Sequence, residues 1–318
     1  MRALITGVTG FIGSHLAEYL LNKGYKIYGN YYRGTTNDNI EHIKSQIKVL
    51  KVDVRDGKAI EKLLKEVKPD EVYHLAAQSY PALSWEDPRY TLETNIIGTD
   101  NLFQSILKLK ISPKILLACS SAEYGFISQD ELPVIEERIL NPLHPYGVSK
   151  VATELLGYQY WKNFGLKVIS VRIFNTIGPR KYADVCGDFC QQIAEIESGR
   201  RKPVIFVGNL NGKRGFLDIR DLIRALYLVM KRGKVGEVYN ICGKRAIRVK
   251  ELLDVLLKLA KIKISIREDR KKLRSTDEPI IFGDISKIKR DTGWKPEIPI
   301  EKTLIDTLNW WRERVNKI

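Results

Sequence analysis

Short apolar runs alternate with amphipathic segments through the first half of the chain. Runs rich in apolar and aromatic residues occupy 3–6, 26–31, 47–52, 71–75, 114–118 and 167–173, each short enough for one strand. Residues 11–21, 59–67, 91–109 and 146–164 instead repeat apolar positions at helical spacing, and Gly24 and Pro69 stand just past two of these helices. This alternation with short connections predicts an α/β protein with a doubly wound parallel sheet.

The second half follows a different rhythm. We expect helices at 188–197, 218–230, 249–260 and 301–312, with short strand-like pieces such as 204–207 and 238–241 between them. The sequence shows no internal repeat and no long linker. We therefore predict a large domain at 1–173, to which segments near 216–242 return, and a smaller mixed α/β lobe made mainly by 174–318.

A glycine-rich turn joins the first predicted strand to the first predicted helix. It reads Gly7-Val8-Thr9-Gly10-Phe11-Ile12-Gly13, which is G-x-x-G-x-x-G spacing. Glycines let the chain turn tightly and approach a pyrophosphate, and the N-terminus of the following helix offers unpaired N–H groups to that anion. The turn predicts a dinucleotide site on a Rossmann-like domain, with Thr9, Phe11 and Ile12 also contacting the cofactor.

The end of the second strand bears on the choice between NAD and NADP. A carboxylate there would accept hydrogen bonds from the 2′-hydroxyl of NAD, but the sequence is Asn30-Tyr31-Tyr32-Arg33, without an acid. Because Arg33 is able to pair with a 2′-phosphate, we predict NADP, with NAD as the alternative. Further cofactor contacts are expected where the third and fourth strands end, from Asp53, Val54, Leu75, Ala76 and Ala77.

Three residues near the carboxyl edge of the predicted sheet form a candidate catalytic group. Tyr146 and Lys150 are four positions apart on one helix, and Ser120 follows the fifth strand. A neighbouring ammonium and an oxidised nicotinamide ring both lower the pKa of a tyrosine, which is ordinarily about 10. We predict that Tyr146 moves the proton, that Lys150 tunes it and holds the nicotinamide ribose, and that Ser120 binds the reacting oxygen.

Together with the glycine turn, this group resembles the extended short-chain dehydrogenases/reductases that act on nucleotide sugars. The resemblance covers essentially the whole chain. It implies that Asn95 is a structural and cofactor-side residue. It also implies a homodimer in which the helices at 91–109 and 146–164 build a four-helix bundle, with a tetramer as the alternative.

Segments of the second half resemble GDP-4-keto-6-deoxy-mannose reductases and, nearly as closely, GDP-mannose 4,6-dehydratases. These segments are 174–180, 188–193, 207–210, 213–218 and 273–275. By this resemblance, Asn175, Arg214 and Arg274 would hold the diphosphate and ribose of a GDP-linked sugar, for which guanidinium groups offer paired donors. Further substrate contacts are expected from Gln78, Ser84, Ser121, Glu123, Val185 and Asn209.

One position bears on whether the enzyme is a reductase or a dehydratase. By the same resemblance, dehydratases carry an additional acid/base carboxylate two residues before a Tyr-Gly pair. Here the sequence is Ser120-Ser121-Ala122-Glu123-Tyr124-Gly125, so Ala122 stands at that position. In extended chain a one-residue offset turns the Glu123 side chain to the opposite face, although a local bulge would turn it back.

We therefore expect NADPH-dependent reduction of GDP-4-keto-6-deoxy-D-mannose to GDP-D-rhamnose. Three alternatives stay open: a GDP-mannose 4,6-dehydratase, a nucleotide-sugar 4-epimerase that returns the hydride to the other face, and a non-enzymatic NADP-binding regulator.

Composition and charge narrow the class of protein further. The 318 residues are 44% hydrophobic, yet no apolar run approaches the ~20 residues that cross a bilayer. With no signal-peptide pattern and four cysteines without C-x-x-C spacing, we expect a cytoplasmic protein without a membrane partner. The four histidines are far apart, so we expect no metal site.

The net charge of +15 resides entirely in the second half, because residues 1–150 carry 18 basic and 18 acidic side chains. The basic residues are scattered among apolar helix positions, so we expect an anionic small-molecule substrate and no nucleic-acid partner.

Overall fold

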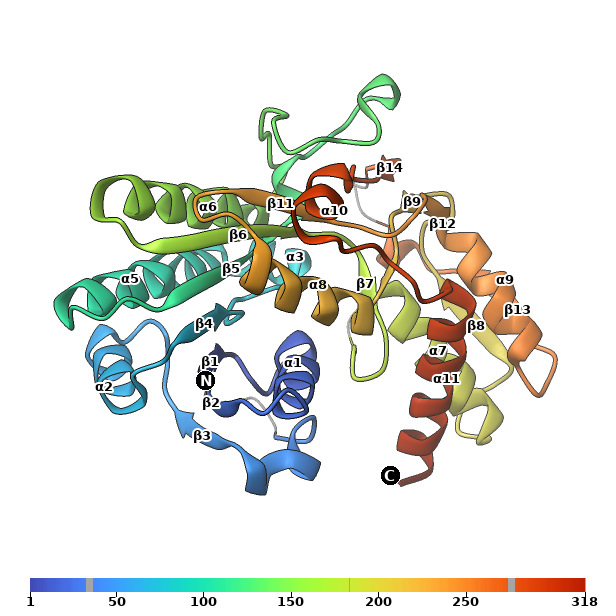
Figure 1. Ribbon diagram of the computed structural model, residues 1–318. Coiled ribbons are helices and arrows are strands. Elements are labelled where there is room, and N and C mark those ends of the chain that lie inside the picture. Colours follow the sequence, from blue (N-terminus) through green and yellow to red (C-terminus); the bar gives the residue numbers. More distant parts are fainter. Residues whose placement is uncertain (33–36, 183, 274–277, 318) are drawn as a thin grey trace.

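A seven-stranded parallel sheet forms the centre of the larger part of the molecule (Figure 1). The computed structural model describes residues 1–32, 37–182, 184–273 and 278–317, so Arg33 and Arg274 lie outside the described residues. The strands lie in the order β11-β6-β5-β4-β1-β2-β3. They are β1 (Arg2–Thr6), β2 (Lys26–Tyr31), β3 (Lys48–Lys51), β4 (Glu71–His74), β5 (Lys114–Ser120), β6 (Lys167–Ile173) and β11 (Val238–Ile241). This sheet confirms the predicted fold class.

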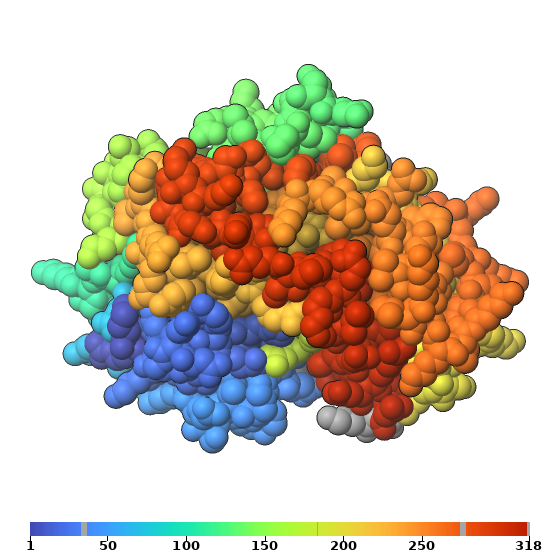
Figure 2. Space-filling view, turned by 45° about the vertical axis from the view of Figure 1, so that its right-hand side comes forward, coloured from blue at the N-terminus to red at the C-terminus, as the bar shows by residue number. Residues whose placement is uncertain are grey.

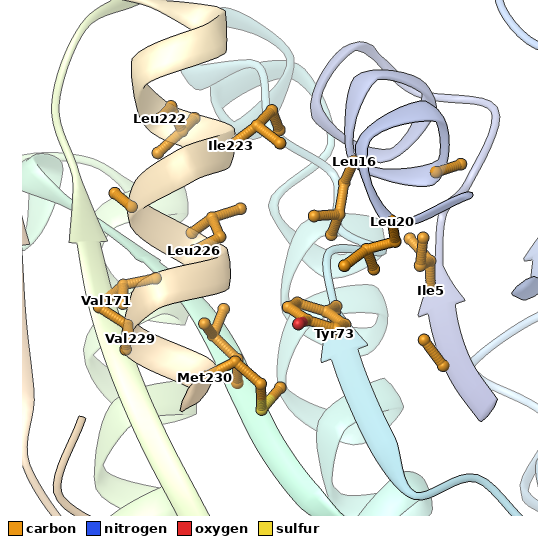
Figure 3. Packing of buried hydrophobic residues seen from close by; sticks show 14 of the residues in the cluster. Ile5, Leu16, Leu20, Tyr73, Val171, Leu222, Ile223, Leu226, Val229 and Met230 are labelled. Atoms are coloured by element: carbon orange, nitrogen blue, oxygen red, sulfur yellow. The ribbon is translucent and has the colours of Figure 1, made fainter. Parts of the chain in front are cut away.

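Helices cover both faces of the sheet (Figure 1). On one face lie α1 (Phe11–Leu21) and α8 (Ile219–Arg232), and on the other lie α2 (Gly57–Val67), α5 (Gly98–Lys108) and α6 (Pro145–Phe164). Figure 3 shows Leu16 and Leu20 of α1 and Leu226 of α8 directed at the sheet residues Tyr73 and Val171, all of them buried. Burial of these apolar faces is the main term that stabilises such a layered fold.

The predicted helix at 91–109 is present but contains a π-helical turn. The structure has α4 (Pro88–Leu92), a π-helical turn η2 (Glu93–Ile97) and then α5. Asn95 lies in that turn, where its side-chain amide accepts a hydrogen bond from the backbone N–H of Gln78 at 2.8 Å and donates to the Gln78 carbonyl at 3.0 Å. The widened turn therefore aims Asn95 at the loop that follows β4, which a regular helical pattern does not predict.

The second lobe has a core of its own. It packs α7 (Val185–Glu197), α9 (Val249–Leu259) and α11 (Ile300–Lys317) around Phe189, Leu253 and Trp311. Its small sheets pair β8 (Val204–Val207) with β13 (Ser265–Glu268), β7 (Thr176–Ile177) with β10 (Leu217–Asp218), and β9 (Lys213–Arg214) with β12 (Ile247–Arg248) and β14 (Ile280–Ile281).

Chain segments cross between the two parts. Residues 238–241 pair with β6 as the edge strand β11 of the large sheet. Figure 2 shows the C-terminal segment in red crossing the face of the molecule between the N-terminal half in blue and the second lobe in orange. In the described part of the chain, no helix combines the length and the apolar character needed to cross a membrane.

The remaining helices are short. They are α3 (Pro81–Glu86), α10 (Ser286–Thr292), η1 (Glu41–Gln46), η3 (Ser121–Glu123), η4 (Gln129–Glu131) and η5 (Arg270–Lys272).

Candidate active site

A large cleft runs along the carboxyl ends of the parallel strands. Its volume is about 1630 Å³, well above the roughly 300–1,000 Å³ of a site for one small ligand. The loops after β1, β2, β4, β5 and β6 line one side, and residues of the second lobe line the other. Ligands bind at this edge in open α/β sheets, and the cleft has room for a dinucleotide and a second nucleotide-sized molecule.

The glycine turn forms a tight cradle at one end of the cleft. Gly7 has a φ of +71°, and a Cβ at Gly13 would lie 2.3 Å from the Gly7 carbonyl oxygen. The N-terminus of α1 follows at Phe11 and carries no side-chain cap from the described residues. Because its N–H groups face the cleft and side chains are excluded from the turn, the cradle fits a pyrophosphate. Thr9, Phe11 and Ile12 also line the cleft, as predicted.

The end of β2 offers polar groups that fit an adenosine. The Asn30 side chain donates to the Val52 carbonyl at 2.8 Å, while its Oδ1 atom is buried without a partner in the described part of the chain. Asp53 lies beside it and pairs with the Arg55 guanidinium at 2.7 Å. Burial would raise the pKa of Asp53, but hydrogen bonds from Arg55 lower it, so Asp53 is an ionised acceptor. The unpartnered Asn30 Oδ1 and the ionised Asp53 carboxylate are both acceptors that suit the hydroxyl or amino donors of an adenosine.

The predicted catalytic residues lie together at the middle of the cleft. Ser120, Tyr146 and Lys150 all line it. The Lys150 ammonium donates to the Ala118 carbonyl at 2.7 Å and lies 5.9 Å from the centre of the Tyr146 ring. Leu75, Ala76, Ala77 and Val54 line the cleft between this group and the glycine turn. A dinucleotide bound at the turn would therefore place its nicotinamide end beside Tyr146.

The pKa of Tyr146 differs from what the sequence suggested. Burial raises it to about 12, against the lowering effect of a hydrogen bond with Ser120. Burial also lowers the pKa of Lys150 itself. In the protein alone Tyr146 is therefore a protonated phenol at neutral pH. A protonated phenol suits the donation of a proton to a reduced carbonyl oxygen.

His144 is a cleft residue for which the sequence predicted no functional role. Its ring stacks on Tyr146 with centroids 5.9 Å apart, and its Nδ1 atom accepts a hydrogen bond from the Gly147 N–H at 3.0 Å. It therefore caps helix α6 and supports the Tyr146 ring. In the sequence, this capping role is indicated by a polar residue immediately before Pro145, at the start of a predicted helix.

The turn after β5 decides which side chains reach the catalytic group. Ser121 and Ala122 line the cleft beside Ser120, whereas Glu123 is fully buried at 0% exposure. The expected substrate contact from Glu123 is thus corrected. Its carboxylate accepts a hydrogen bond from the Ser120 N–H at 2.7 Å, and Ser120 Oγ accepts one from the Ala122 N–H at 3.2 Å. This reciprocal cap turns Glu123 into the interior.

Three further predicted residues do not reach the cleft. Gln78 is 5% exposed, and its side chain donates to Thr91 Oγ1 at 2.9 Å. Ser84 is buried and donates to the Pro81 carbonyl within its own helix. Asn95 is 2% exposed and bonds Gln78 and Ser149. The expected substrate contacts of Gln78 and Ser84 and the cofactor contact of Asn95 are corrected, because all three side chains fix the loops and helices behind the site.

The second lobe contributes polar residues to the opposite wall. Asn175, Val185, Asn209 and Arg214 line the cleft as predicted. Four basic residues without a predicted role join them, namely Arg180, Lys181, Lys271 and Lys272. Three of them are paired with carboxylates, Arg180 with Glu18, Lys181 with Asp184 and Lys272 with Asp188. An anionic substrate would therefore compete with these carboxylates for their charge. The excess of basic residues in this half indicated a basic wall, but the sequence did not show which of these residues face the cleft.

A dinucleotide cradle that faces a serine, a tyrosine and a lysine across one cleft defines a nucleotide-sugar enzyme of the short-chain dehydrogenase/reductase class. The chain belongs to the GDP-mannose 4,6-dehydratase family, whose model, described as GDP-mannose 4,6 dehydratase, matches residues 4–307.

Relatives with different activities resemble the chain to a similar degree. It is 32% identical over 317 residues to GDP-6-deoxy-D-mannose reductase of Pseudomonas aeruginosa, covering 99% of both chains. It is 31% identical to GDP-mannose 4,6 dehydratase 1 of Arabidopsis thaliana, covering 94% of this chain and 86% of the relative. Among solved structures, RMD from Pseudomonas aeruginosa complexed with NADPH superposes with a TM-score of 0.85 at 32% identity, covering 98% of this chain and 99% of the other.

Proposed function

We propose that this protein reduces the 4-keto group of GDP-4-keto-6-deoxy-D-mannose with NADPH and forms GDP-D-rhamnose. The observation that carries the proposal is the pair Ala122 and Glu123: the cleft position beside Ser120 holds a methyl group, and the neighbouring carboxylate is buried. Removal of a C5 proton and expulsion of a C6 hydroxyl require an acid/base group at the sugar, and Ala122 supplies none. The similarity to a reductase and to an NADPH complex supports the same choice.

NADPH would supply the hydride to the sugar and would leave as NADP. The glycine turn would hold its pyrophosphate, and Asn30 and Asp53 its adenosine. Arg33 is our proposed partner of the 2′-phosphate. The expected division into a cofactor-binding part (1–173, with β11 and α8) and a substrate-binding part (mainly 174–318) belongs to this proposal, as do the substrate contacts of Asn175, Val185, Asn209, Arg214 and Arg274.

Tyr146 acts as the proton donor in the proposed reaction. The phenol gives its proton to the sugar O4 as negative charge develops there, Ser120 donates a hydrogen bond to the same oxygen, and the two contacts stabilise the transition state. Lys150 holds Tyr146 near Ala118 and offers its remaining N–H donors to the nicotinamide ribose.

The experiment compares two substrates while NADPH absorbance is followed. NADPH oxidation with GDP-4-keto-6-deoxy-D-mannose but not with GDP-mannose, together with a GDP-rhamnose product, is the expected result. A Tyr146→Phe variant, which lacks the proposed proton donor, is the matched control for NADPH oxidation. Formation of a keto sugar from GDP-mannose without net NADPH consumption would instead establish the dehydratase. Tightly retained NAD and interconversion of C4 epimers would establish an epimerase.

A homodimer is the oligomeric state that we propose. Helix α6 buries one face on the sheet, yet Val148, Leu155 and Tyr158 are 47%, 58% and 53% exposed on another. Exposed apolar side chains aligned on a long helix are typical of a helix-packing interface. We also propose a cytoplasmic location, because all four cysteines are buried free thiols, as is usual in a reducing compartment.

A further inference from the structure

Behind the Ser120 turn lies a buried cluster in which two carboxyl groups face one guanidinium. Glu123, Glu154 and Arg172 are 0%, 6% and 4% exposed. Arg172 binds Glu154 with both arms of its fork, at 2.5 Å from Nη2 and 2.9 Å from Nε. Its Nη1 atom donates to the Tyr124 hydroxyl and to the Glu136 carbonyl, each at 2.8 Å. The guanidinium is therefore committed to groups other than Glu123.

The two oxygens of Glu123 have different surroundings. Oε1 accepts the Ser120 N–H at 2.7 Å. Oε2 is buried and has no hydrogen-bond partner in the described part of the chain. Its nearest cation is Arg172 Nε at 3.5 Å, whose hydrogen is directed to Glu154. A carboxylate oxygen buried without a protein donor is costly, because it has lost hydration and gained no hydrogen bond from the described residues.

A proton on Glu123 would remove this cost. One carboxyl oxygen each from Glu123 and Glu154, with the Cys119 sulfur, lie within 4.8 Å of one another. Two carboxyl groups this close in a buried site do not both ionise. Burial first, and Glu154 second, raise the pKa of Glu123 well above its ordinary range. A protonated Oε2 becomes a donor, and Glu154 is the acceptor beside it.

We propose that Glu123 is a neutral carboxylic acid in the native protein, shares its proton with Glu154, and positions the catalytic Ser120 by accepting its backbone N–H. The ionisable groups around Glu123 come from three elements and the turn itself: Cys119 of β5, Tyr146, Lys150 and Glu154 of α6, Arg172 of β6, and Tyr124. An ionised Glu123 would raise the pKa values of Tyr146 and Lys150. A neutral Glu123 therefore leaves the proton affinity of the catalytic pair undisturbed.

Protonation of Glu123 makes stability depend on pH in a defined direction. Glu123 keeps its proton in the folded state at pH values where the unfolded chain has lost it. Its stabilising contribution is therefore full below about pH 4.5 and is lost as the pH rises through the folded-state pKa. Between these limits the unfolding equilibrium constant of the wild type should rise by up to about tenfold per pH unit relative to Glu123→Gln.

The test is urea unfolding of the wild type, Glu123→Gln and Glu154→Gln between pH 5 and 9. Glu123→Gln should fold, keep the Ser120 contact through its amide oxygen, and gain stability over the wild type as the pH rises. Glu154→Gln should lose stability across the whole range, because it removes the carboxylate that both arms of Arg172 bind. A carboxylic-acid C=O band in the infrared spectrum at neutral pH should be present in the wild type and absent from Glu123→Gln.

Three results would overturn the proposal. They are a stability difference between Glu123→Gln and the wild type that does not change with pH, no infrared band lost in that variant, and failure of Glu123→Gln to fold. An activity arm rests on the proposed function: Glu123→Leu should lower kcat about tenfold by removing the acceptor for Ser120, with unchanged NADPH affinity, while Glu123→Gln retains kcat. Because unfolding and the infrared band need no substrate, they separate this proposal from the proposed activity.

Discussion

The ammonium of Lys150 donates a hydrogen bond to the backbone carbonyl of Ala118 at 2.7 Å. This contact joins helix α6 to the end of β5, two residues before Ser120. Lys150 is 5% exposed, so little solvent reaches its ammonium and the Ala118 carbonyl takes the place of water as its acceptor. Lys150 therefore brings a positive charge to the site and also sets the distance between the helix that carries Tyr146 and the strand end that carries Ser120.

A Lys150→Met variant should lose both functions of this side chain. Methionine fills a similar volume but does not donate to Ala118 or to a ribose hydroxyl. We expect kcat to fall by about a hundredfold or more and the NADPH dissociation constant to rise. Stopped-flow turnover and fluorescence titration with NADPH measure the two effects. Unchanged NADPH affinity in a folded variant would argue against the ribose contact.

Tyr146→Phe should remove the proton donor and leave the cavity intact. We expect a loss of about 10²–10⁴-fold in kcat, with NADPH binding close to that of the wild type. The rate of the wild type should not fall on the alkaline side through pH 6–9, since the acid form is needed and burial raises the pKa of Tyr146 to about 12. A descending limb near pH 7 to 8 that disappears in this variant would contradict the high pKa.

Two glycine substitutions in the cradle should differ in severity. A Cβ at Gly13 would meet the Gly7 carbonyl oxygen at 2.3 Å and Val8 Cα at 2.9 Å, whereas a Cβ at Gly10 would meet the Gly7 oxygen at 3.2 Å. Gly13→Ala must displace the backbone that holds the pyrophosphate, and Gly10→Ala needs a small adjustment. We expect NADPH affinity to fall by more than about tenfold for Gly13→Ala and by less for Gly10→Ala. Isothermal titration with NADPH gives the comparison, and the reverse order would be evidence against the cradle.

Charges placed on α6 should disrupt the proposed dimer. Leu155 and Tyr158 are more than half exposed, so Leu155→Glu combined with Tyr158→Glu adds charge without disturbing the monomer core. We expect the mass from light scattering to change from dimer to monomer. Lys65→Glu on the exposed side of α2 is the matched control and should stay dimeric. A wild-type protein that is monomeric at micromolar concentration would refute the proposed interface.

Trp294 anchors the segment before α11 to helix α8. It is 0% exposed, and its indole N–H donates to the Asp221 carbonyl at 3.0 Å. Trp294→Ala should lower the free energy of unfolding by about 3–5 kcal/mol, through lost burial and the cavity that remains. Urea unfolding measures this loss. A decrease below about 1 kcal/mol would show that the tryptophan contributes little to the core.

The sequence alone determined the features that depend on local pattern. The strands at 26–31, 167–173 and 238–241 occur as predicted, because short apolar runs between turns have few other ways to bury themselves. The glycine turn lies between β1 and α1, where G-x-x-G-x-x-G spacing requires it. Tyr146 and Lys150 share one face of α6 because the helical repeat fixes that relation.

Tertiary packing decided what the local pattern left open. Glu123 accepts the Ser120 N–H within its own turn, and it turns inward because Glu154 and Arg172, from distant parts of the chain, lie behind it. The π-helical turn at Asn95 and the burial of Gln78 likewise depend on contacts between segments. The high pKa of Tyr146 follows from burial, which a sequence does not display. Spacing sets which residues are neighbours along an element, whereas desolvation and hydrogen-bond partners exist only once separate elements have packed together.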